Sequence, residues 1–358
     1  MKFPLRLYYA QNQLDKEWKI WFQKYGGFVG FSSLVPNEGD YSVLPHTNES
    51  KVLIRNEKGL DLLGNFCRHR QAQLLSGSGN IKGRRIVCPI HRWAYDLEGN
   101  LTAAHGFKPL PILTLKEPEV YEHNGLLAAD LKILEAFRTM KFFNTDGFNA
   151  SDYKYVSSCV TDYDINWKEY MDVYFDNYHV QTYHPGLRAI VDVKNLEWEF
   201  GDNFIVQKVG WNKNFYKHPG SPKFERYADE LKATYGEKNW DCGAMWLSIF
   251  PNIIIEKLQD FMLTGIAIPV GPCKTRMFFS TYAHKSIVDN QPLWNAFNGA
   301  MDETEEEDGE ILESICKGRY QLWMTGYEDH GPYHHPTEVG MRHFHEYILK
   351  CMDEPIEE

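Results

Sequence analysis

Two cysteine–histidine pairs are the residues of this sequence whose types and spacing point most directly to chemistry. Cys67 and His69 are separated by one residue in NFCRHRQAQ, and after eighteen further residues Cys88 and His91 are separated by two residues in CPIHRWAYDLEGNL. A Cys-x-His step is too short to share a helix face, but it suits a tight loop at the end of a hairpin. Four such ligands suit either one tetrahedral zinc ion or a [2Fe–2S] cluster, with two cysteines on one iron and two histidines on the other.

A second group of candidate ligands lies in NWKEYMDVYFDNYHVQTYH, residues 166–184, which is predicted to be one helix that stops at Pro185. Asp176 and His179 are three residues apart and would share a face of that helix. His184 lies five residues beyond His179, which turns it about 140° away in an ideal helix. The histidines therefore converge only if the helix bulges or unwinds near its end. On spacing alone, a histidine pair at a helix terminus is more often structural than metal-binding.

An acidic stretch, predicted to be a long helix from about Met301 to Tyr320, offers the carboxylate that a two-histidine site needs. Its apolar stripe consists of Ile311, Leu312 and Ile315. One turn further back, the same stripe reaches Glu307 and Asp308. The other acidic residues are interpreted as a solvated helix face, and the stretch lacks the glycine that an EF-hand calcium loop requires.

Five histidines near the end of the sequence are an alternative source of metal ligands: His330, His334, His335, His343 and His345. Their spacing does not favour a site, because residues two apart do not face each other on a helix and Gly331-Pro332 interrupts the first pair. We expect some of them to line a pocket or a contact between subunits instead.

The combination CRHR…CPIHRWAYDLEGNL resembles the Rieske signature of the non-haem iron oxygenases, including the Trp, Tyr-Asp and Gly that follow the second histidine. One position departs from that pattern, because Gln71 stands where the family usually has glycine. The resemblance implies that Cys67, His69, Cys88 and His91 hold a [2Fe–2S] cluster rather than zinc.

The stretch DNYHVQTYHP resembles the mononuclear iron motif of the same family, Asp-x2-His-x4-His. The resemblance implies that His179 and His184 bind Fe(II). The family places its third ligand in a Glu-Asp step before an apolar helix, which selects Asp308, with Glu307 as the fallback.

The same resemblance gives roles to two further acids. It implies that Asp176 is not a ligand but bridges the iron site to the Rieske domain of a neighbouring subunit, in a homotrimer. Asp172, one turn earlier, is expected to support the site from behind the ligands.

The elements that must position these residues form an α+β chain. Short alternating runs such as KVLIRN, LDLLGNF, RRIVCPI and GLLAADL predict an all-β Rieske domain over 39–140, after an N-terminal helical segment over 1–38 that packs on the catalytic domain. Longer runs such as NFIVQKVGW and TRMFFSTYA, together with the helices, predict a catalytic mononuclear iron domain over 141–358. By resemblance this domain is a helix-grip (START-like) fold, an antiparallel sheet around a long helix.

Composition limits the function classes. The net charge of −11 over 358 residues argues against nucleic acid or an anionic membrane as a partner reached by bulk electrostatics. No apolar run is long enough to span a membrane, the N-terminus does not resemble a signal peptide, and the seven cysteines are scattered. We therefore predict a cytoplasmic protein. SGSGNIKG lacks the spacing of a dinucleotide fingerprint, so electrons must come from a separate NAD(P)H-dependent reductase or ferredoxin.

The sequence thus predicts a terminal oxygenase component, similar to the alpha subunits of ring-hydroxylating oxygenases and of choline and carnitine monooxygenases. It would use O₂ to hydroxylate or demethylate a small organic substrate, since the chain length is nearer to that of the alpha-only monooxygenases. The alternatives are a Rieske electron carrier, a non-catalytic metal-binding protein, or cis-dihydroxylation of an aromatic ring. Three aromatic residues could form an apolar pocket or a cage for a quaternary ammonium group, or could be ordinary core: Trp246, Phe250 and Phe261.

Overall fold

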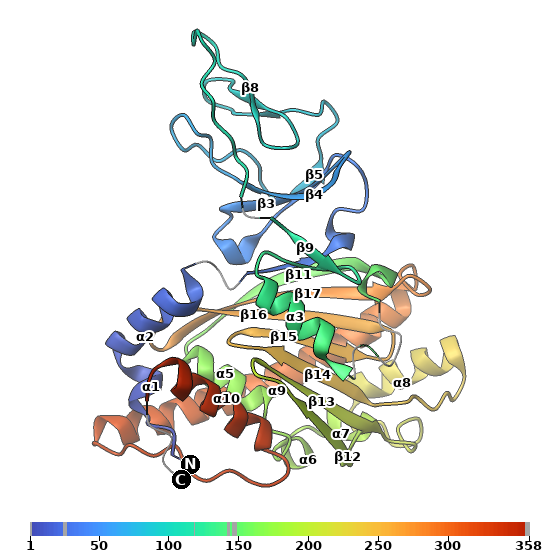
Figure 1. Ribbon diagram of the computed structural model, residues 1–358. Helices are drawn as coiled ribbons and strands as arrows, with labels where there is room; N and C mark the ends of the chain where they lie inside the picture. Colours follow the sequence, from blue (N-terminus) through green and yellow to red (C-terminus); the bar gives the residue numbers. More distant parts are fainter. Residues whose placement is uncertain (1, 24–26, 118, 142–143, 145–148, 355–358) are drawn as a thin grey trace. The chain divides into compact units, whose positions relative to one another are not determined.

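The computed structural model describes residues 2–23, 27–117, 119–141, 144 and 149–354. Its chain divides into two compact units, which Figure 1 shows in colours that follow the sequence. The small unit comprises Lys24–Thr139 and Gly147–Tyr155. The large unit comprises Met1–Gln23, Met140–Asp146 and Val156–Glu358. The small unit is therefore inserted into the sequence of the large one.

Three antiparallel sheets build the described part of the small unit, with strand orders β4-β3-β2-β5, β1-β10-β9 and β6-β7-β8. The strands are β1 Phe28–Phe31, β2 Asp40–Val43, β3 Lys51–Asn56, β4 Gly59–Gly64, β5 Ser78–Asn80, β6 Ile86–Val87, β7 Ala94–Tyr95, β8 Leu101–Ala103, β9 Tyr121–His123 and β10 Leu126–Ala128. The described residues of the unit also form one α-helix and three 3₁₀ turns: α3 Leu131–Thr139, η2 Ser32–Leu34, η3 Pro45–Thr47 and η4 Ala150–Asp152.

The small unit begins before the boundary at residue 39 that the sequence suggested. Phe28 pairs with Ala128 across β1 and β10, and the N–H of Ala129 donates to Gly27 O at 2.7 Å. These contacts place the segment by which the chain enters the small unit beside the segment by which it leaves. The expected helical segment over 1–38 is thus divided, since only residues up to Gln23 lie in the large unit.

A single seven-stranded antiparallel sheet forms the centre of the large unit, in the order β11-β17-β16-β15-β14-β13-β12. The strands are β11 Tyr153–Tyr163, β12 Val191–Phe200, β13 Phe204–Trp211, β14 Ala244–Ile249, β15 Ile253–Leu258, β16 Phe261–Gly271 and β17 Lys274–His284. Strands β13 to β17 follow the alternating runs of the sequence closely. The sheet and its long helix confirm the predicted α+β class.

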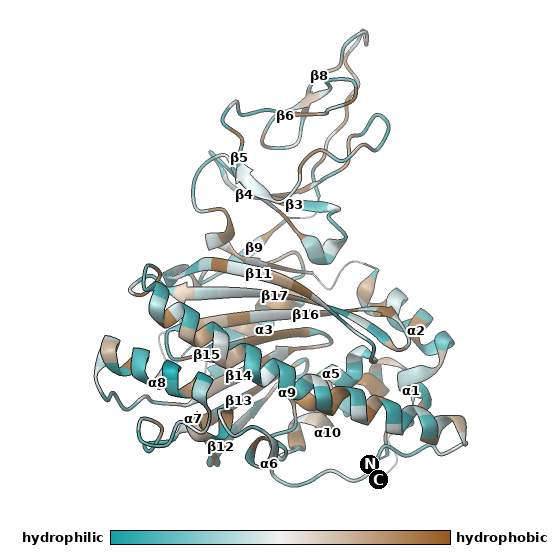
Figure 2. Cartoon of the chain, turned by 180° about the vertical axis from the view of Figure 1, so that it is seen from behind, coloured by the Kyte–Doolittle hydropathy of each residue, from teal (hydrophilic) through white to brown (hydrophobic). Residues whose placement is uncertain are grey.

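Helices pack on this sheet. They are α1 Arg6–Tyr9, α2 Gln11–Glu17 with a π-helical turn η1 Trp18–Phe22, α5 Trp167–Tyr174, α6 Val180–Tyr183, α7 Leu187–Ile190, α8 Pro222–Tyr235, α9 Gln291–Met324 and α10 Val339–Cys351. Figure 2 shows α8 and α9 in front of the sheet. Phe297 of α9 stacks on Phe261 of β16 at 4.0 Å and meets Tyr227 of α8 edge-on at 5.5 Å, so one apolar core joins these elements.

The expected N-terminal helical segment contains α2 and η1, with Leu14 and Phe22 buried. Among the described helices, none combines the length and the apolar character needed to cross a bilayer.

Candidate metal centres

The two ligand loops of the small unit share one backbone pattern. In each loop the N–H of the cysteine donates to the carbonyl five residues ahead, Cys67 to Ala72 and Cys88 to Trp93, both at 2.8 Å. Both cysteines are buried among the side chains of the sheets, next to residues such as Ile54. The β core therefore holds two thiols in equivalent loops, each closed on itself by its own backbone.

A left-handed residue closes each loop. The N–H groups of Gln71 and Arg92 donate to the carbonyls of Cys67 and Cys88 at 2.9 and 3.2 Å, and their φ angles are 55° and 60°. Glycine adopts this conformation without steric cost. This explains why glycine would be usual at the position of Gln71, and shows that the glutamine keeps the loop shape.

The two imidazoles lie toward the outside of the same loops. The rings of His69 and His91 are 4.6 Å apart, and His69 stacks on Trp93 at 4.8 Å. His91 is exposed and His69 is half-buried, but the Nδ1 atom of His69 is buried and has no hydrogen-bond partner among the described residues. Partial desolvation, followed by the nearby His91 and Arg70, lowers the pKa of His69 and favours the neutral form that binds metal.

The four donors fit a two-metal cluster better than one ion. Among the described residues, only one group places three donor atoms within 4.8 Å of one another, and Cys67, His69, Cys88 and His91 are not that group. A tetrahedral zinc ion would draw its ligand atoms closer together than this. The two thiols are buried, the two imidazoles lie further out, and one imidazole nitrogen has no hydrogen-bond partner among the described residues. This arrangement suits a cluster in which the cysteines would bind one iron and the histidines the other.

The second candidate centre is built where α5 ends. The continuous helix predicted over 166–184 is wrong, because α5 stops at Tyr174 and α6 begins only at Val180. Between them, the carboxylate of Asp176 accepts the N–H groups of Tyr178 and His179 at 2.5 and 3.3 Å. Asp176 and His179 therefore share a turn rather than a helix face.

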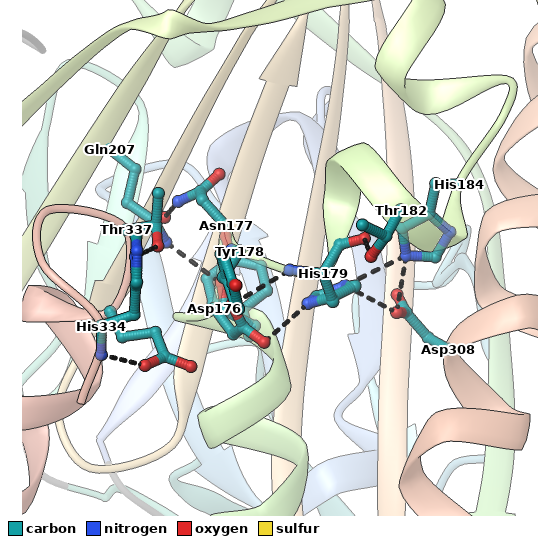
Figure 3. A network of polar contacts seen from close by, with 12 residues as sticks. Asp176, Asn177, Tyr178, His179, Thr182, His184, Gln207, Asp308, His334 and Thr337 are labelled. Atoms are coloured by element: carbon teal, nitrogen blue, oxygen red, sulfur yellow. Dashed lines mark hydrogen bonds and ion pairs between the residues drawn. The ribbon is translucent and has the colours of Figure 1, made fainter. Parts of the chain in front are cut away.

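This interruption brings the two histidines together with Asp308 of α9 (Figure 3). The Nε2 atoms of His179 and His184 lie 3.1 Å apart. Asp308 Oδ1 lies 3.4 Å from His179 Nε2 and 3.0 Å from His184 Nε2. Two imidazoles and one carboxylate on one side of a centre form the ligand set of non-haem Fe(II) sites that keep open positions.

The second ring nitrogen of each histidine faces another carboxylate. His179 Nδ1 lies 3.0 Å from Asp176 Oδ2, and His184 Nδ1 lies 2.7 Å from Glu307 Oε2. A proton on each Nδ1 leaves the Nε2 lone pairs directed toward the centre. The structure thus brings Asp308, and not Glu307, to the two Nε2 atoms.

Charges at this centre are strongly coupled. Burial lowers the pKa of His179, but hydrogen bonds with Asp176 and Asp308 outweigh that effect and raise the pKa to about 9. Burial raises the pKa of Asp308, but hydrogen bonds from His179 and His184 outweigh it and lower the pKa. The pocket therefore favours a positive charge between these three side chains, which a divalent metal ion would supply.

Asp172 does not contact this centre directly. Its carboxylate accepts the Tyr8 hydroxyl at 2.6 Å, lies 2.7 Å from Arg319 Nη1 and lies 2.8 Å from His345 Nε2. Burial raises the pKa of Asp172, but His345 and Arg319 outweigh it and lower the pKa. The residue ties α5 to α1, α9 and α10, so it fixes the helix from which the iron-ligand segment continues.

The C-terminal histidines serve packing and hydrogen bonding. His345 joins the buried network of Asp172, His343 bonds to Gly201 O at 2.8 Å, and His334 stacks on Tyr178 at 4.2 Å. None of them takes part in a group of three potential metal ligands among the described residues.

The three aromatic residues named from the sequence differ in their surroundings. Phe261 is core beside Phe297, and Phe250 packs against Phe344 with the rings 5.2 Å apart. Trp246 pairs across the sheet with Glu256, a residue that the sequence did not single out. Only Trp246 stays a candidate for the substrate side of the site.

Two family models match the chain, and together they define its class. The Rieske [2Fe-2S] domain matches residues 27–114, and the catalytic domain of ring-hydroxylating alpha subunits matches residues 150–354, more than half of the sequence. The chain therefore belongs to the Rieske non-haem iron oxygenases, as an alpha (terminal oxygenase) subunit. These are O₂-dependent oxidoreductases that carry a Rieske [2Fe–2S] cluster and a mononuclear non-haem iron, as predicted, and a simple electron carrier would lack the second domain.

Two relatives are similar to this chain over nearly the whole length of both proteins. The chain is 36% identical to a putrescine 2-hydroxylase of Ralstonia nicotianae, over 98% of this chain and 96% of that protein. It is 28% identical to the carnitine monooxygenase oxygenase subunit of Escherichia coli, over 97% and 92% of the two chains. These relatives are named as a hydroxylase and a monooxygenase, so cis-dihydroxylation is not favoured.

Solved structures confirm the fold. A quaternary ammonium Rieske monooxygenase in complex with L-carnitine superposes with a TM-score of 0.75 at 19% identity, covering 99% of this chain and 96% of the other. Naphthalene 1,2-dioxygenase from Rhodococcus sp., bound to indole, gives a TM-score of 0.73 at 19% identity, with coverage of 98% and 94%.

Proposed function

We propose that this alpha subunit hydroxylates an aliphatic C–H bond of a small amine, and that putrescine is the first compound to test. The observation that carries the proposal is the convergence of His179, His184 and Asp308 from three separate segments. Similarity to a putrescine 2-hydroxylase over almost the whole of both chains supports the choice of substrate.

In the proposed roles, His179, His184 and Asp308 hold Fe(II), and Cys67, His69, Cys88 and His91 hold the cluster. A bound Fe(II) would supply the open positions at which O₂ is activated. The overall reaction converts C–H to C–OH with one oxygen atom of O₂ and reduces the other atom to water. It consumes two protons and two electrons, and the electrons come from a separate reductase or ferredoxin.

The chain's own side chains prepare this chemistry in two ways. Asp176 and Glu307 hold the outer Nδ1 atoms of the two histidines, which fixes the tautomer and the ring orientation before metal binds. The same carboxylates make the two imidazoles more basic, which strengthens their Nε2 atoms as metal ligands once the metal displaces any proton there.

Asp176 is also proposed as the bridge that receives electrons from the Rieske domain of a second copy, in a homotrimer. Tyr178, beside Asp176, is 56% exposed. In the small unit, Ile90 beside His91 is 61% exposed, and Phe107 near His69 is 44% exposed. Large apolar side chains exposed next to both electron-transfer sites suit surfaces that a neighbouring copy covers.

The test is product formation by anaerobically purified protein that is then supplied with a compatible reductase, putrescine and ¹⁸O₂. We expect about three irons per chain, the reduced-state EPR signal of a mixed-ligand cluster, and a hydroxylated amine that carries one ¹⁸O atom. The matched control is His179→Ala, which should retain the cluster signal and form no product. A colourless, zinc-containing protein, or an oxidised product without label, would contradict the proposal.

A further inference from the structure

A row of side chains crosses the sheet of the large unit beneath the iron-ligand segment. Gln207 of β13, Trp246 of β14, Glu256 of β15 and Leu263 of β16 are successive cross-strand partners, so their side chains lie on one face. Gln207 fixes this face to the end of α5, because its amide donates to Tyr174 O at 3.1 Å. Glu256 is thus the charged member of a row that leads toward the metal centre.

Helix α5 lies directly over Glu256. The hydroxyl of Tyr174 is 3.2 Å from Leu247 O and 3.3 Å from Ile255 O, the residues next to Trp246 and Glu256. Burial raises the pKa of the Tyr170 hydroxyl, one turn earlier, and negative charge on Glu305, Glu256 and Asp308 raises it further. Glu256 is therefore a partly buried acid on the face of the sheet that α5 covers.

Glu305 is a second acid near Glu256, and it comes from α9. It lies one turn before Asp308, and it accepts the hydroxyl proton of Tyr163 at 2.6 Å. Burial raises the pKa of Glu256, and the charges of Asp308 and Glu305 raise it further, to about 8, while a hydrogen bond from Trp246 offsets only part of this effect. The three carboxylates are therefore close enough to repel one another.

Two of these carboxylates, those of Glu256 and Glu305, have no cationic partner among the described residues. In the parts of the chain that the structure describes, no lysine or arginine forms an ion pair with Glu256 or Glu305. Ionising a half-buried carboxyl group that has no counter-ion costs free energy, so Glu256 is best explained by a cation that the ligand brings.

We infer that Glu256, assisted by Glu305 and by the indole of Trp246, binds the ammonium group of a small aliphatic primary amine and so sets which carbon faces the metal. A primary ammonium group carries three N–H donors that two carboxylates can accept, whereas a quaternary ammonium group has none and is favoured by an aromatic cage instead. This inference rests on the proposed function and names the residue that selects its substrate.

The first test is binding, measured calorimetrically without O₂ on the iron-loaded holoenzyme. Glu256→Gln keeps the shape and removes the charge. We expect it to weaken putrescine binding roughly 10- to 100-fold, the loss typical of a charge-assisted hydrogen bond, with the cluster spectrum and iron content unchanged. Glu306→Gln, an exposed position on α9 that pairs with Lys223, is the matched control and should bind as the wild type does. Wild-type affinity in Glu256→Gln would overturn the inference.

The second test measures melting temperatures and ligand binding, so it does not require the enzyme to turn over. Because a Glu256 with a pKa of about 8 is largely protonated at neutral pH, Glu256→Gln should leave the melting temperature of the ligand-free protein nearly unchanged and abolish the rise that putrescine gives the wild type. For wild-type protein, 1-aminobutane should bind at least tenfold more tightly than butan-1-ol. Equal binding of the amine and the alcohol would overturn the inference, whereas binding of putrescine without hydroxylation would contradict only the proposed reaction.

Discussion

At the scale of single residues, the iron site depends on which nitrogen of each histidine is occupied. His184 is held by Glu307 on one nitrogen and faces Asp308 with the other, so two adjacent acids of one helix have opposite tasks. Asp308 completes the ligand set, and Glu307 orients His184. Substitution of Asp308 should therefore remove the metal, whereas substitution of Glu307 should only weaken its binding.

Asp308→Ala is expected to lose the mononuclear iron while the cluster remains, which lowers the iron content from about three to about two per chain. Glu307→Ala should keep the third iron but bind it 10- to 100-fold more weakly, because it removes only the partner of His184 Nδ1. Metal analysis against a chelator series, with the cluster EPR signal as internal control, measures both. The reverse order of severity would exchange the two roles.

A buried histidine of the small unit should make its stability depend on pH. His46 bonds through Nε2 to Phe28 O at 3.0 Å, and burial lowers its pKa to about 4. In the unfolded chain, His46 takes up a proton below its ordinary pKa of about 6.5, whereas in the folded chain it stays neutral until about pH 4. The contribution of neutral His46 to the free energy of unfolding is therefore fully present above pH 6.5. It decreases as the pH falls, by about 2 kcal/mol at pH 5.

His46→Gln retains a hydrogen-bond donor and does not titrate, so its unfolding free energy should fall less between pH 7 and pH 5. Denaturant titrations followed by cluster absorbance measure the difference. His105→Gln, at an exposed position of the same unit, serves as control and should keep the wild-type pH dependence. Parallel curves for wild type and His46→Gln would show that the histidine does not contribute.

At the scale of elements, the Rieske loops are defined by backbone closure, and one residue closes each loop at a steric cost. Gln71→Gly should stabilise the small unit by up to about 1 kcal/mol, because glycine adopts a φ of 55° without strain and the exposed glutamine side chain contributes little. The denaturant midpoint of cluster loss measures the gain. Arg70→Gly, in the same loop without a positive φ, should be neutral or destabilising, and an equal gain there would refute the explanation.

Local signals in the sequence predicted much of the fold. KVLIRN is strand β3 over the predicted residues, and the alternating runs of the large sheet correspond to β13 through β17. Helix α9 begins ten residues before its predicted start, because Asn290 caps Leu293 N and the first turns bury small residues such as Ala296 and Ala300 that carry a weak pattern. Element type was thus readable wherever periodicity was strong.

The five-residue spacing of His179 and His184 indicated that the helix must be interrupted for them to converge, but the place of the interruption, between Tyr174 and Val180, was not readable. It depends on distant partners, since Asn177 N–H donates to Thr337 O at 3.1 Å and the Asn177 side chain bonds to Gln207. The buried network of Asp172 joins residues more than 140 positions apart, such as Tyr8 and Arg319. The roles of Glu256 and Glu307 likewise follow only from which strands and helices meet. Ligand types were visible in the motifs, but their supporting shell is a product of the tertiary fold.

At the scale of the whole molecule, the electron path requires more than one chain if Asp176 has its proposed role. Asp176→Asn keeps the shape of the side chain but removes the charge that strengthens its hydrogen bonds. We expect both metal centres to be loaded, the cluster to be reduced normally, and turnover to fail. Single-turnover experiments on the pre-reduced variant measure this directly. Unimpaired cluster oxidation on addition of substrate and O₂, or a strictly monomeric and active enzyme, would remove Asp176 from the path.

The insertion of the small unit also has a consequence for biosynthesis. The N-terminal helices are held by α5, through contacts such as Glu17 Oε1 with Lys168 Nζ at 2.6 Å and Tyr8 with Asp172. These contacts join residues that are 151 and 164 positions apart, so at about 5 to 20 residues per second a ribosome needs roughly 8 to 33 s to supply the partner. During that delay the first helices have no native surface to pack on, while the β unit has already emerged between them. We expect the nascent chain to be able to acquire its iron–sulfur cluster before the pocket for the second metal exists.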